Sequence, residues 1–360
     1  MGILDTIIRT KQSETLRTFN PESIVEEVLL GLKERERQIL MKRYGLKGSE
    51  IKTLAAIGSE HGLTRERVRQ IEKDLIKLLR KNGRNHASLN TVKELLINTI
   101  NEHGKVMAEE TLLKVMGVKS QNDRNAIIFI LSLIDDVNSY LHENYKKCWA
   151  LATFNKNFLN DFTVEARKLL ESSGQPIEEK NLVEKFGQTE FFKTKSEELG
   201  QKVILNFLDL AHKIEKNVFG HWGLDSSKQI VPKDVGDKAY LVLKQNGKPE
   251  HYSGITEMIN GAKFDNRTAY KETVHNELIK DSRFILIGRG IYALSEWGYK
   301  PGVVSDVIKE ILALTGKPLE KERIIAEVLK RRQVKKNTIL VGLSNKKLFR
   351  KVEKNLYALV

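Results

Sequence analysis

A short glycine-centred motif returns four times in this sequence. It occurs as "HGKV", "SGQP", "NGKP" and "TGKP", and its glycines are 70, 73 and 69 residues apart at Gly104, Gly174, Gly247 and Gly316. Each copy lies between two segments with helical spacing of apolar residues, and each repeat closes on an apolar tail such as "IYAL" or "LYAL". Regular spacing of this kind predicts tandem copies of one supersecondary unit.

The third repeat displays the plan of this unit most clearly. "AYLVLKQNGKP" and "GITEMI" have helical spacing, and "RFILIGRGIYAL" contains two β-rich runs around Gly288, Arg289 and Gly290, which is typical of a hairpin. Three helices followed by a hairpin describe a winged helix. The remaining repeats have the same order of elements, so four winged-helix units are expected in tandem.

A different helical plan precedes the repeats. The segment "IKTLAAIGSEHG" predicts a short helix that stops at Gly62, and Thr64 stands where the N-cap of a longer helix is wanted. This arrangement is the helix-turn-helix plan. The apolar residues of the longer helix, at i, i+3, i+7 and i+10, are Val68, Ile71, Leu75 and Leu78. This spacing predicts one face anchored in the domain core and the opposite face in solvent.

The fold class expected from these patterns is mainly α: a helix-turn-helix domain followed by tandem winged-helix units, each with helices and a small β-hairpin. The polar stretch "KNGRNHASLN", residues 81–90, predicts a linker between the two parts. The expected ranges are 1–29 for an N-terminal helical extension, 30–82 for the helix-turn-helix, and 91–154, 161–224, 235–298 and 302–360 for repeats 1 to 4.

Positive charge is concentrated at two places in the chain. The formal net charge is +14; residues 31–86 carry 15 basic and 7 acidic residues (+8), and residues 300–360 carry 15 and 6 (+9). Such clustering indicates a polyanionic partner. An anionic membrane surface is disfavoured because no helix has the bulky aromatic and apolar face that inserts into an interface. The charge pattern therefore favours double-stranded DNA.

The exposed face of the helix after Thr64 has side chains suited to reading bases. Arg65 and Arg69 can pair with guanine, Gln70 with adenine, and Glu66 can accept from cytosine. Residues further along such a helix meet phosphates, which assigns Lys73, Lys77 and Arg80 to the DNA backbone. The alternative reading, a solvated amphipathic helix with Arg–Glu pairs, stays open at this point.

The N-terminal segment resembles a known family. "LKERERQILMKRYGL", followed by "TLAAIGSEHGLTRERVRQIEKDLIKLLRK", is similar to region 4 of the sigma-70 family over residues 30–81. The resemblance implies recognition of the −35 promoter element and docking on the flap of the RNA polymerase core. It also implies base reading by the four residues named above. The DNA-backbone contacts that go with this assignment are Arg35, Arg43, Thr53, Thr64 and Arg67.

The segment departs from the family pattern in two respects. Ala55 and Ala56 stand where an acidic pair is usual, and Asp74 stands where a basic residue is common, which bears on the base preference. Full sigma factors also have an aromatic-rich domain ahead of region 4 that captures the melted −10 element. Phe19 is the only aromatic residue before residue 30. We therefore expect a protein that does not melt promoters by the family route.

The winged-helix repeats also have a resemblance. Repeat 3, at 235–298, is similar to the HARE-type winged helix-turn-helix, which occurs in the delta subunit of RNA polymerase and in restriction and chromatin proteins. This implies binding to DNA or to a transcription complex without catalysis. Repeat 4 contains "LKRRQVKKNT", and its basic residues predict a second phosphate-binding patch, against the alternative of a solvated face. This patch consists of Arg331, Arg332, Lys335 and Lys336. Repeats 1 and 2 lack such a cluster, which favours spacers or protein-binding modules.

Catalytic and cofactor motifs are missing from the sequence. It contains no G-x-x-x-x-G-K-[ST], H-E-x-x-H or C-x-x-C pattern, so we expect neither an enzyme nor a bound metal or cofactor. The single cysteine, Cys148, excludes an intramolecular disulfide and is expected in the core, which fits a reducing cytoplasm. No segment approaches the roughly 20 apolar residues that span a bilayer. A cytoplasmic, nucleoid-associated protein is the expectation.

Two functional hypotheses follow from the sequence. The leading one is a sequence-specific transcription factor related to sigma region 4, which reads a promoter-like element and contacts RNA polymerase. The alternative is an adaptor, or a chromatin- or restriction-associated protein, whose winged-helix repeats bind other proteins while the helix-turn-helix tethers it to DNA.

Overall fold

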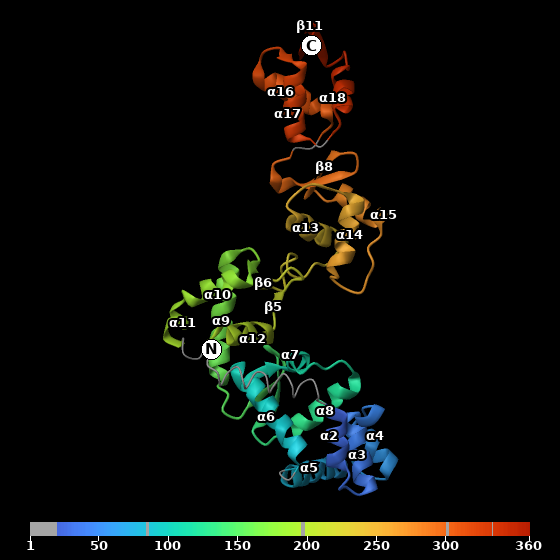
Figure 1. Ribbon diagram of the computed structural model, residues 1–360, viewed down its shortest axis with the longest axis vertical. Coiled ribbons are helices and arrows are strands. Elements are labelled where there is room, and N and C mark those ends of the chain that lie inside the picture. The colour runs from blue at the N-terminus through green and yellow to red at the C-terminus, as the bar shows by residue number, and fades with distance from the viewer. Residues whose placement is uncertain (1–19, 84–85, 196–198, 300–301, 333) are drawn as a thin grey trace. The chain divides into compact units, whose positions relative to one another are not determined.

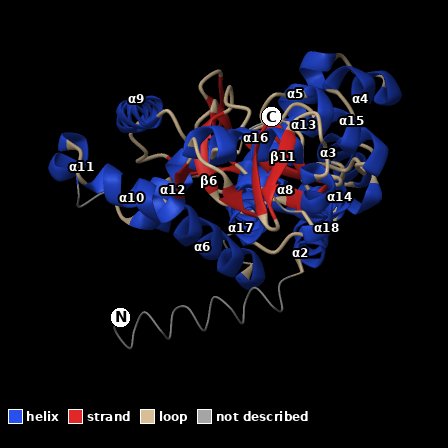
Figure 2. Cartoon of the chain, turned by 90° about the horizontal axis from the view of Figure 1, so that it is seen from above, coloured by secondary structure: helices blue, strands red, loops and turns tan. Residues whose placement is uncertain are grey.

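The computed structural model describes residues 20–360 except 84–85, 196–198, 300–301 and 333. Helices (blue in Figure 2) predominate in the described residues, and the strands form four three-stranded antiparallel sheets. The described chain divides into two compact bodies. The first contains the residues up to Gly174 and Glu179–Glu215, and the second contains Gln175–Glu178 and Lys216–Val360. The mainly α fold class is confirmed.

The N-terminal part of the first body is helical (Figure 1). Its elements are α2 (Pro21–Leu29), α3 (Glu34–Tyr44), the 3-10 turn η1 (Leu46–Gly48), α4 (Leu54–His61) and α5 (Arg65–Asn82). The Asn20 side chain caps α2 by accepting from the Ser23 amide at 3.1 Å, and Pro21 suits the first helical position. Of the predicted extension over 1–29, residues 1–19 lie outside the described residues.

Each repeat has the same order of elements: a helix, a short strand, further helices and two strands. Repeat 1 consists of α6 (Ala87–Glu102), β1 (Val106–Ala108), α7 (Glu109–Val115), α8 (Gln121–Ser132), β2 (Val137–His142) and β3 (Tyr145–Leu151). Repeat 2 consists of α9 (Lys156–Ser173), β4 (Ile177–Glu178), α10 (Glu179–Gly187), α11 (Glu190–Lys195), α12 (Gln201–Leu210), β5 (Ile214–Lys216) and β6 (His221–Leu224).

The last two repeats lie in the second body. Repeat 3 consists of α13 (Val235–Asn246), β7 (Glu250–His251), α14 (Tyr252–Ala262), α15 (Lys271–Lys280), β8 (Phe284–Gly288), β9 (Ile291–Leu294) and the 3-10 turn η3 (Ser295–Trp297). Repeat 4 consists of α16 (Val304–Thr315), β10 (Leu319–Glu320), α17 (Lys321–Arg331), α18 (Lys336–Leu343), β11 (Phe349–Glu353) and β12 (Leu356–Leu359).

The recurring glycine motif marks the end of each first helix. The glycines at 104, 174, 247 and 316 have φ of 87°, 60°, 69° and 61°, a region that side chains with a Cβ avoid. The chain then enters a short strand that the sequence analysis did not predict. In every repeat this strand pairs with the last strand, and the strand orders of the four sheets are β1-β3-β2, β4-β6-β5, β7-β9-β8 and β10-β12-β11. Two or three residues are too few for the period-2 alternation that announces a strand.

The linker expected over 81–90 is mostly helical. Helix α5 continues to Asn82 and α6 begins at Ala87; Lys81 and Asn82 are exposed, whereas Leu89 is fully buried. The helix-turn-helix and repeat 1 therefore share one hydrophobic core. The buried residues of this core run from α2 to β3 and include Leu40, Leu75, Leu79, Leu96, Ile130 and Trp149.

Specific contacts join the helix-turn-helix to α8 within the shared core. The ring of Tyr44, at the end of α3, packs edge-on against Phe129 with 5.1 Å between centroids, and burial raises the pKa of Tyr44 to about 12. The buried Asn125 amide donates to the Gly45 carbonyl at 2.8 Å. The Arg80 guanidinium donates to the Ser132 carbonyl at 2.8 Å. Polar and apolar contacts together attach α3 and α5 to repeat 1.

The turn between α4 and α5 brings two backbones very close together. Gly62 ends α4 with φ 66°, and the Leu63 amide donates to the Gly58 carbonyl at 2.8 Å. A Cβ at Gly58 would lie 2.5 Å from the Leu63 carbonyl oxygen. Only glycine fits at this point, so Gly58 sets the approach of the turn to α4.

A carboxylate holds α4 to the segment that precedes it. Glu60 accepts from the Lys42 ammonium at 2.6 Å and also pairs with Lys52. Hydrogen bonds from these two lysines lower the pKa of Glu60 from its ordinary value of 4.5 to about 2. These two ion pairs hold α3 and the η1–α4 loop against α4 at the protein surface.

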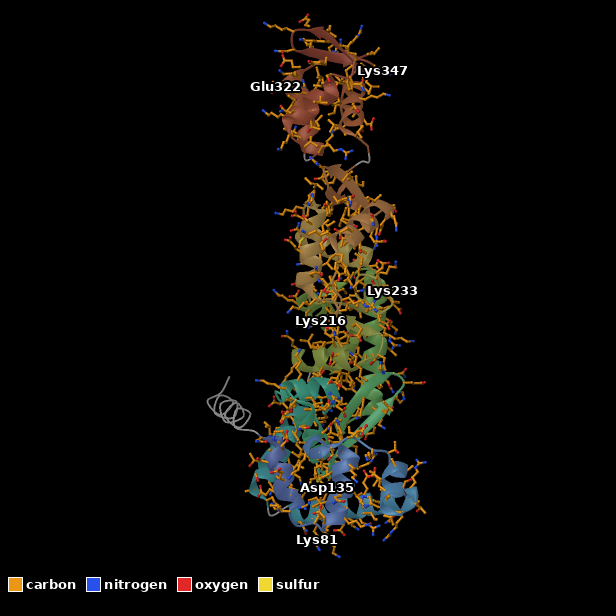
Figure 3. All side chains as sticks on the ribbon, turned by 90° about the vertical axis from the view of Figure 1, so that its right-hand side faces the viewer. Lys81, Asp135, Lys216, Lys233, Glu322 and Lys347 are labelled. Carbon is orange, nitrogen blue, oxygen red and sulfur yellow. The ribbon has the colours of Figure 1, made fainter. Side chains whose placement is uncertain are left out.

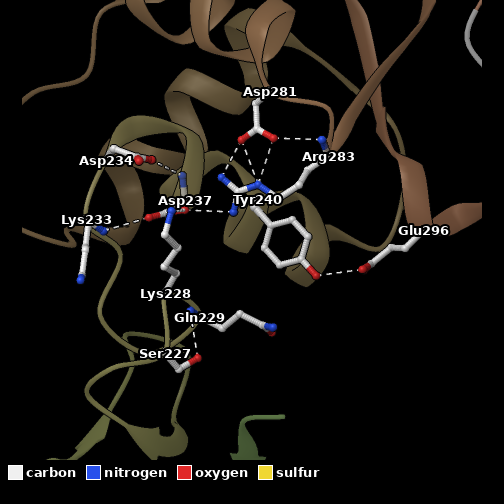
Figure 4. A network of polar contacts seen from close by, with 10 residues as sticks. All are labelled: Ser227, Lys228, Gln229, Lys233, Asp234, Asp237, Tyr240, Asp281, Arg283 and Glu296. Atoms are coloured by element: carbon white, nitrogen blue, oxygen red, sulfur yellow. Dashed lines mark hydrogen bonds and ion pairs between the residues drawn. The ribbon is translucent and has the colours of Figure 1, made fainter. Parts of the chain in front are cut away.

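A polar network stabilises repeat 3 around the start of α13 (Figure 4). The Asp237 side chain is completely buried; it accepts from the Lys233 amide at 3.1 Å and lies 2.9 Å from the Arg283 guanidinium. Arg283 also binds Asp281 at 2.6 Å. A buried carboxylate needs such partners. The network thus fixes α13 to the segment that begins β8, and it has the geometry of a structural ion-pair cluster.

The shared core predicts that repeat 1 is needed for the stability of the helix-turn-helix. Phe129→Ala should destabilise the chain by about 3–5 kcal/mol, since it removes a fully buried ring and leaves a cavity beside Tyr44. Leu141→Ala, at an 84% exposed position in repeat 1, serves as the control and should change stability little. Denaturant unfolding measures both. The shared core would be contradicted if repeat 1 unfolded while the backbone amides of α3–α5 kept their full protection from hydrogen exchange.

The close approach at the turn predicts intolerance of any side chain. Gly58→Ala should cost about 1–3 kcal/mol, since the turn must move away from α4 to admit the methyl group. Ser59→Ala, the neighbouring exposed position, should be nearly neutral. Thermal unfolding followed by circular dichroism compares the two variants; equal melting temperatures would contradict the packing described here.

The lowered pKa of Glu60 predicts an acid-sensitive contribution to stability. A carboxyl with a depressed folded-state pKa stabilises the fold above its ordinary value of 4.5, and this contribution disappears as pH falls toward about 2. Glu60→Gln should therefore reduce stability at pH 6 and converge with the parent near pH 2. Glu94→Gln, on the exposed side of α6, provides the control. Melting temperatures of the three proteins across this range test the prediction.

Candidate nucleic-acid interface

Helix α5 begins at a side-chain cap and buries one face. The Thr64 hydroxyl oxygen accepts from the Arg67 amide at 3.2 Å, as the sequence predicts for an N-cap. Val68 packs with Ile39 and Ile57 in the core of the helix-turn-helix, whereas Leu75 and Leu79 belong to the core shared with repeat 1. The first half of the helix is buried in one core and the second half in the other, and the opposite face of the helix is exposed to solvent.

One of the predicted anchor residues points the wrong way. Leu78 is 43% exposed and Leu79 is 3% exposed, so the buried position lies one residue later than predicted. Each residue of a helix with 3.6 residues per turn is rotated by about 100° from the one before it. The residue eleven positions after Val68 therefore points about 20° away from the direction of Val68, whereas the residue ten positions after it points about 80° away. The series i+3, i+7, i+10 drifts off the buried face, and i+11 returns to it.

The four predicted base-reading residues lie together near the start of α5. Arg65, Glu66 and Arg69 are exposed and Gln70 is half-buried. The Arg69 guanidinium forms two-point contacts with Glu66 at 2.6–3.1 Å, which lowers the pKa of that carboxyl. The Gln70 amide donates to Asp74 at 3.1 Å. Both pairs are at the surface, so base edges can exchange for these partners at low cost.

A line of cations continues from these residues along α5. Arg67, Lys73 and Lys77 are exposed, and in the described part of the chain their side chains form no ion pair or hydrogen bond. Lys81 extends the line by one more helical turn. Sequence reasoning left Lys81 out of the site, although the spacing of four from Lys77 would have included it.

Other predicted backbone contacts are already used within the fold. The Arg35 guanidinium donates to the His61 carbonyl at 2.9 Å, and Arg43 contacts Glu72 at 3.2 Å. Arg80 is bound to the Ser132 carbonyl and lies 3.2 Å from Asp135. The Thr53 hydroxyl caps α4 through the Ala56 amide at 3.2 Å, as Thr64 caps α5. These residues position α4 and α5, and their contacts with DNA stay a prediction.

An open groove runs beside the basic face of α5. Its volume is about 980 Å³, and it lies between α5 and the start of the hairpin of repeat 1, all within the first body. The charged residues on the α5 side are Arg69, Lys73, Lys77, Arg80 and Lys81 together with Glu72 and Asp74, and the repeat side includes Ser132, Asp135, Asn138, Ser139 and Trp149. Figure 3 labels Lys81 and Asp135 from its two sides. Repeat 1 thus adds polar side chains next to the recognition helix.

The second predicted basic patch is only partly at the surface. Arg332 is 4% exposed and donates to the Leu286 carbonyl at 2.8 Å. The prediction that its guanidinium belongs to a surface patch is therefore wrong. The hydrogen bond compensates for burial of the charge. Arg331 lies 3.9 Å from Glu310. Lys335 and Lys336 stand at the start of α18, where their side chains have no partner among the described residues.

The described residues contain no cluster of three or more His, Cys, Asp or Glu side chains that could hold a metal ion. Cys148 is buried, as expected from the sequence, and burial raises the pKa of its thiol to about 11. Among the helices described, none combines the length and apolar character needed to cross a membrane. The polar surface of α5 therefore remains the candidate site.

Comparisons with known proteins cover the segment that contains α5. Residues 28–81 match the family model described as "Sigma-70, region 4". The chain is 48% identical over 61 residues to RNA polymerase sigma factor SigA of Nostoc sp., covering 17% of this chain and 16% of that protein. It is 36% identical over 80 residues to RNA polymerase principal sigma factor HrdD of Streptomyces viridifaciens, covering 22% and 24%.

A third relative has a similar extent of likeness. RNA polymerase sigma factor SigA1 of Synechococcus elongatus is 42% identical over 76 residues, which is 21% of this chain and 19% of that protein. The chain thus spans about a quarter or less of the length of these three relatives. The family match ends at residue 81, before α6 and the four repeats. Residues 28–81 therefore form a sigma-70 region 4 helix-turn-helix domain.

Proposed function

We propose that this protein is a sequence-specific DNA-binding transcription factor that reads a promoter-like element with α5. The observation that supports the proposal is that Arg65, Glu66, Arg69 and Gln70, whose side chains suit base edges, lie near the start of a region 4 helix whose other face is buried in two cores. An anchored helix presents its side chains with little loss of freedom on binding. The second interpretation, a merely solvated face, does not account for the line of unpaired cations that continues toward Lys81.

Binding would proceed by exchange of partners at the surface of α5. Arg69 leaves Glu66 and forms a bidentate pair with guanine O6 and N7, and Glu66 is then free to accept from cytosine N4. Gln70 leaves Asp74 and pairs with adenine N6 and N7. Arg67, Lys73, Lys77 and Lys81 meet phosphates and release counterions. The reaction is a recognition event, and we propose no catalytic step, metal or cofactor for this chain.

RNA polymerase is the proposed protein partner, because each of the three relatives is named a sigma factor of RNA polymerase. Much of the apolar surface of the region 4 domain is covered by α6 and α8 of repeat 1. A polymerase contact would therefore use apolar residues that remain exposed. Leu30 at 73% and Ile51 at 57% are such residues. A place on the nucleoid in the cytoplasm belongs to the same proposal.

An adaptor role is the alternative proposal. It is favoured by the near-neutral surfaces of repeats 1 to 3, which suit protein partners better than DNA. Pull-down with RNA polymerase core separates the two: association, with or without DNA, supports the transcription factor. No association in either condition supports an adaptor whose helix-turn-helix is only a tether.

Variants of α5 test base reading. On the best duplex selected from a random pool, Arg69→Ala and Gln70→Ala should each cost about 1–3 kcal/mol of binding free energy, because each removes a bidentate base contact. Lys77→Ala should weaken all sequences alike and lower the salt slope by about one. Lys168→Ala, an exposed lysine of α9, is the control for lost charge. Fluorescence anisotropy with selected and random duplexes measures each variant.

Equal losses on selected and random DNA for all three α5 variants would refute base reading and leave only phosphate binding. A loss confined to the selected duplex for Arg69→Ala and Gln70→Ala supports the proposal.

A further inference from the structure

Repeat 4 differs from the other three repeats in the charge of its third helix and hairpin. Counted from the first residue of the helix before the hairpin to the end of the last strand, the formal net charge is −1 for repeat 1 (121–151), +1 for repeat 2 (201–224), +1 for repeat 3 (271–294) and +5 for repeat 4 (336–359). Three copies of the same fold therefore form without an excess of cations on these elements. The charge of repeat 4 is not a requirement of the winged-helix fold.

The cations of repeat 4 lie at the start of α18 and along the hairpin. They are Lys335, Lys336, Lys346, Lys347, Arg350, Lys351 and Lys354, and we call them the cationic wing surface. All seven are exposed, and Lys335 stands at the N-cap of α18. Glu353 is the only acidic residue among residues 334–360. None of the seven side chains has an ion-pair or hydrogen-bond partner among the described residues.

Charges on the other helices of repeat 4 behave differently. Residues 303–332 carry 7 basic and 5 acidic residues, a net +2. Lys330 contacts Glu327 at 2.8 Å, and Lys321 lies 3.9 Å from Glu322. Figure 3 labels Glu322 of α17 and Lys347 of the α18–β11 loop. The α16–α17 part therefore has nearly balanced charge, whereas α18 and the wing carry most of the excess positive charge of the repeat.

The packing of repeat 4 holds the cationic wing surface together. Phe349 of β11 is buried in the same cluster as Ile339 and Leu343 of α18. Arg350 and Lys351 pair in register with Ala358 and Tyr357 of β12, so their backbone is fixed in the sheet. Helix α18 and the hairpin thus pack on a common core, so these cations stand on ordered elements rather than on a flexible basic tail.

We infer that the cationic wing surface of repeat 4 is a second DNA-binding surface, which binds the phosphate backbone of duplex DNA without reading its sequence. Like charges that no acidic side chain neutralises are stabilised by a polyanion, and each phosphate contact releases condensed counterions. Duplex is favoured over single strands because, within the described hairpin of repeat 4, no aromatic ring is fully exposed for stacking: Phe349 is buried and Tyr357 is half-buried. The surface lies in the second body, apart from α5 in sequence and fold.

The test compares two fourfold variants of the full chain. The wing variant combines Lys346→Gln, Lys347→Gln, Arg350→Gln and Lys351→Gln. The matched control combines Lys309→Gln, Lys317→Gln, Lys321→Gln and Arg323→Gln, which removes four cations from the same repeat outside the surface. Binding to a random-sequence duplex is measured by fluorescence anisotropy over a range of salt concentrations.

The wing variant should lower the salt slope by about 3–4, at about 0.9 per phosphate contact, and weaken binding at low salt by about ten- to a hundredfold. The control should change the slope by less than about one. The same loss should appear in a chain that also carries Arg69→Ala, because the two surfaces act separately. A charge-preserving variant with Lys346→Arg, Lys347→Arg and Lys351→Arg should bind like the parent, and circular dichroism checks that every variant is folded.

Several results would overturn the inference. Equal slopes for the wing variant and the control would mean that only the total charge matters. Tighter binding of a single-stranded oligonucleotide than of the duplex, lost in the wing variant, would assign the surface to single strands. Wing-dependent binding to phosphatidylserine vesicles with unchanged duplex binding would assign it to a membrane. A failure of base reading by α5 leaves these outcomes unaffected, so the two proposals fail separately.

Discussion

The structure of the N-terminal half depends on the apolar core that the helix-turn-helix shares with repeat 1. Phe129 against Tyr44, and Leu75 and Leu79 against the helices of repeat 1, bury the inner face of α5 over its second half. The small cluster around Val68 alone would hold only the first half. Because both halves are anchored, the outer face of α5 is displayed as a fixed row of Arg, Gln and Lys side chains. Stability and recognition therefore use opposite faces of the same helix.

The four repeats separate what a fold needs from what a function needs. All of them have a left-handed glycine after the first helix and a short strand paired with the last strand. They differ in charge: repeat 1 neutralises Arg124 and Lys147 with Glu109, whereas repeat 4 leaves its wing cations unpaired among the described residues. An internal comparison of this kind identifies a surface whose composition is not set by packing. Two basic regions on two bodies then suit a protein that holds DNA at more than one place.

Local patterns were enough to predict much of this molecule. Apolar spacing and the N-cap at Thr64 located α5, and the recurring glycines predicted tandem winged helices. The same patterns failed where the outcome depends on distant residues. Leu78 and Leu79 differ by one position along the helix, and Leu79 is the one that joins the core shared with repeat 1. Ser88 and Asn90 suggested a linker, but they are half-buried on a helix whose Leu89 is fully buried, and the Ser88 hydroxyl donates to Glu27 at 2.7 Å.

The sequence by itself determined the region 4 domain, the fold of the repeats and the concentration of charge at two places, because these depend on side-chain type and short-range spacing. Tertiary structure alone decided which cations are available. Arg80, Arg35 and Arg332 have the same charge as Lys77 and Lys351, yet each donates to a backbone carbonyl that lies far away in the sequence. A guanidinium near such a carbonyl forms a hydrogen bond within the fold, because an unpaired buried acceptor or charge is costly. A lysine with no such neighbour stays in solvent, where a phosphate can reach it.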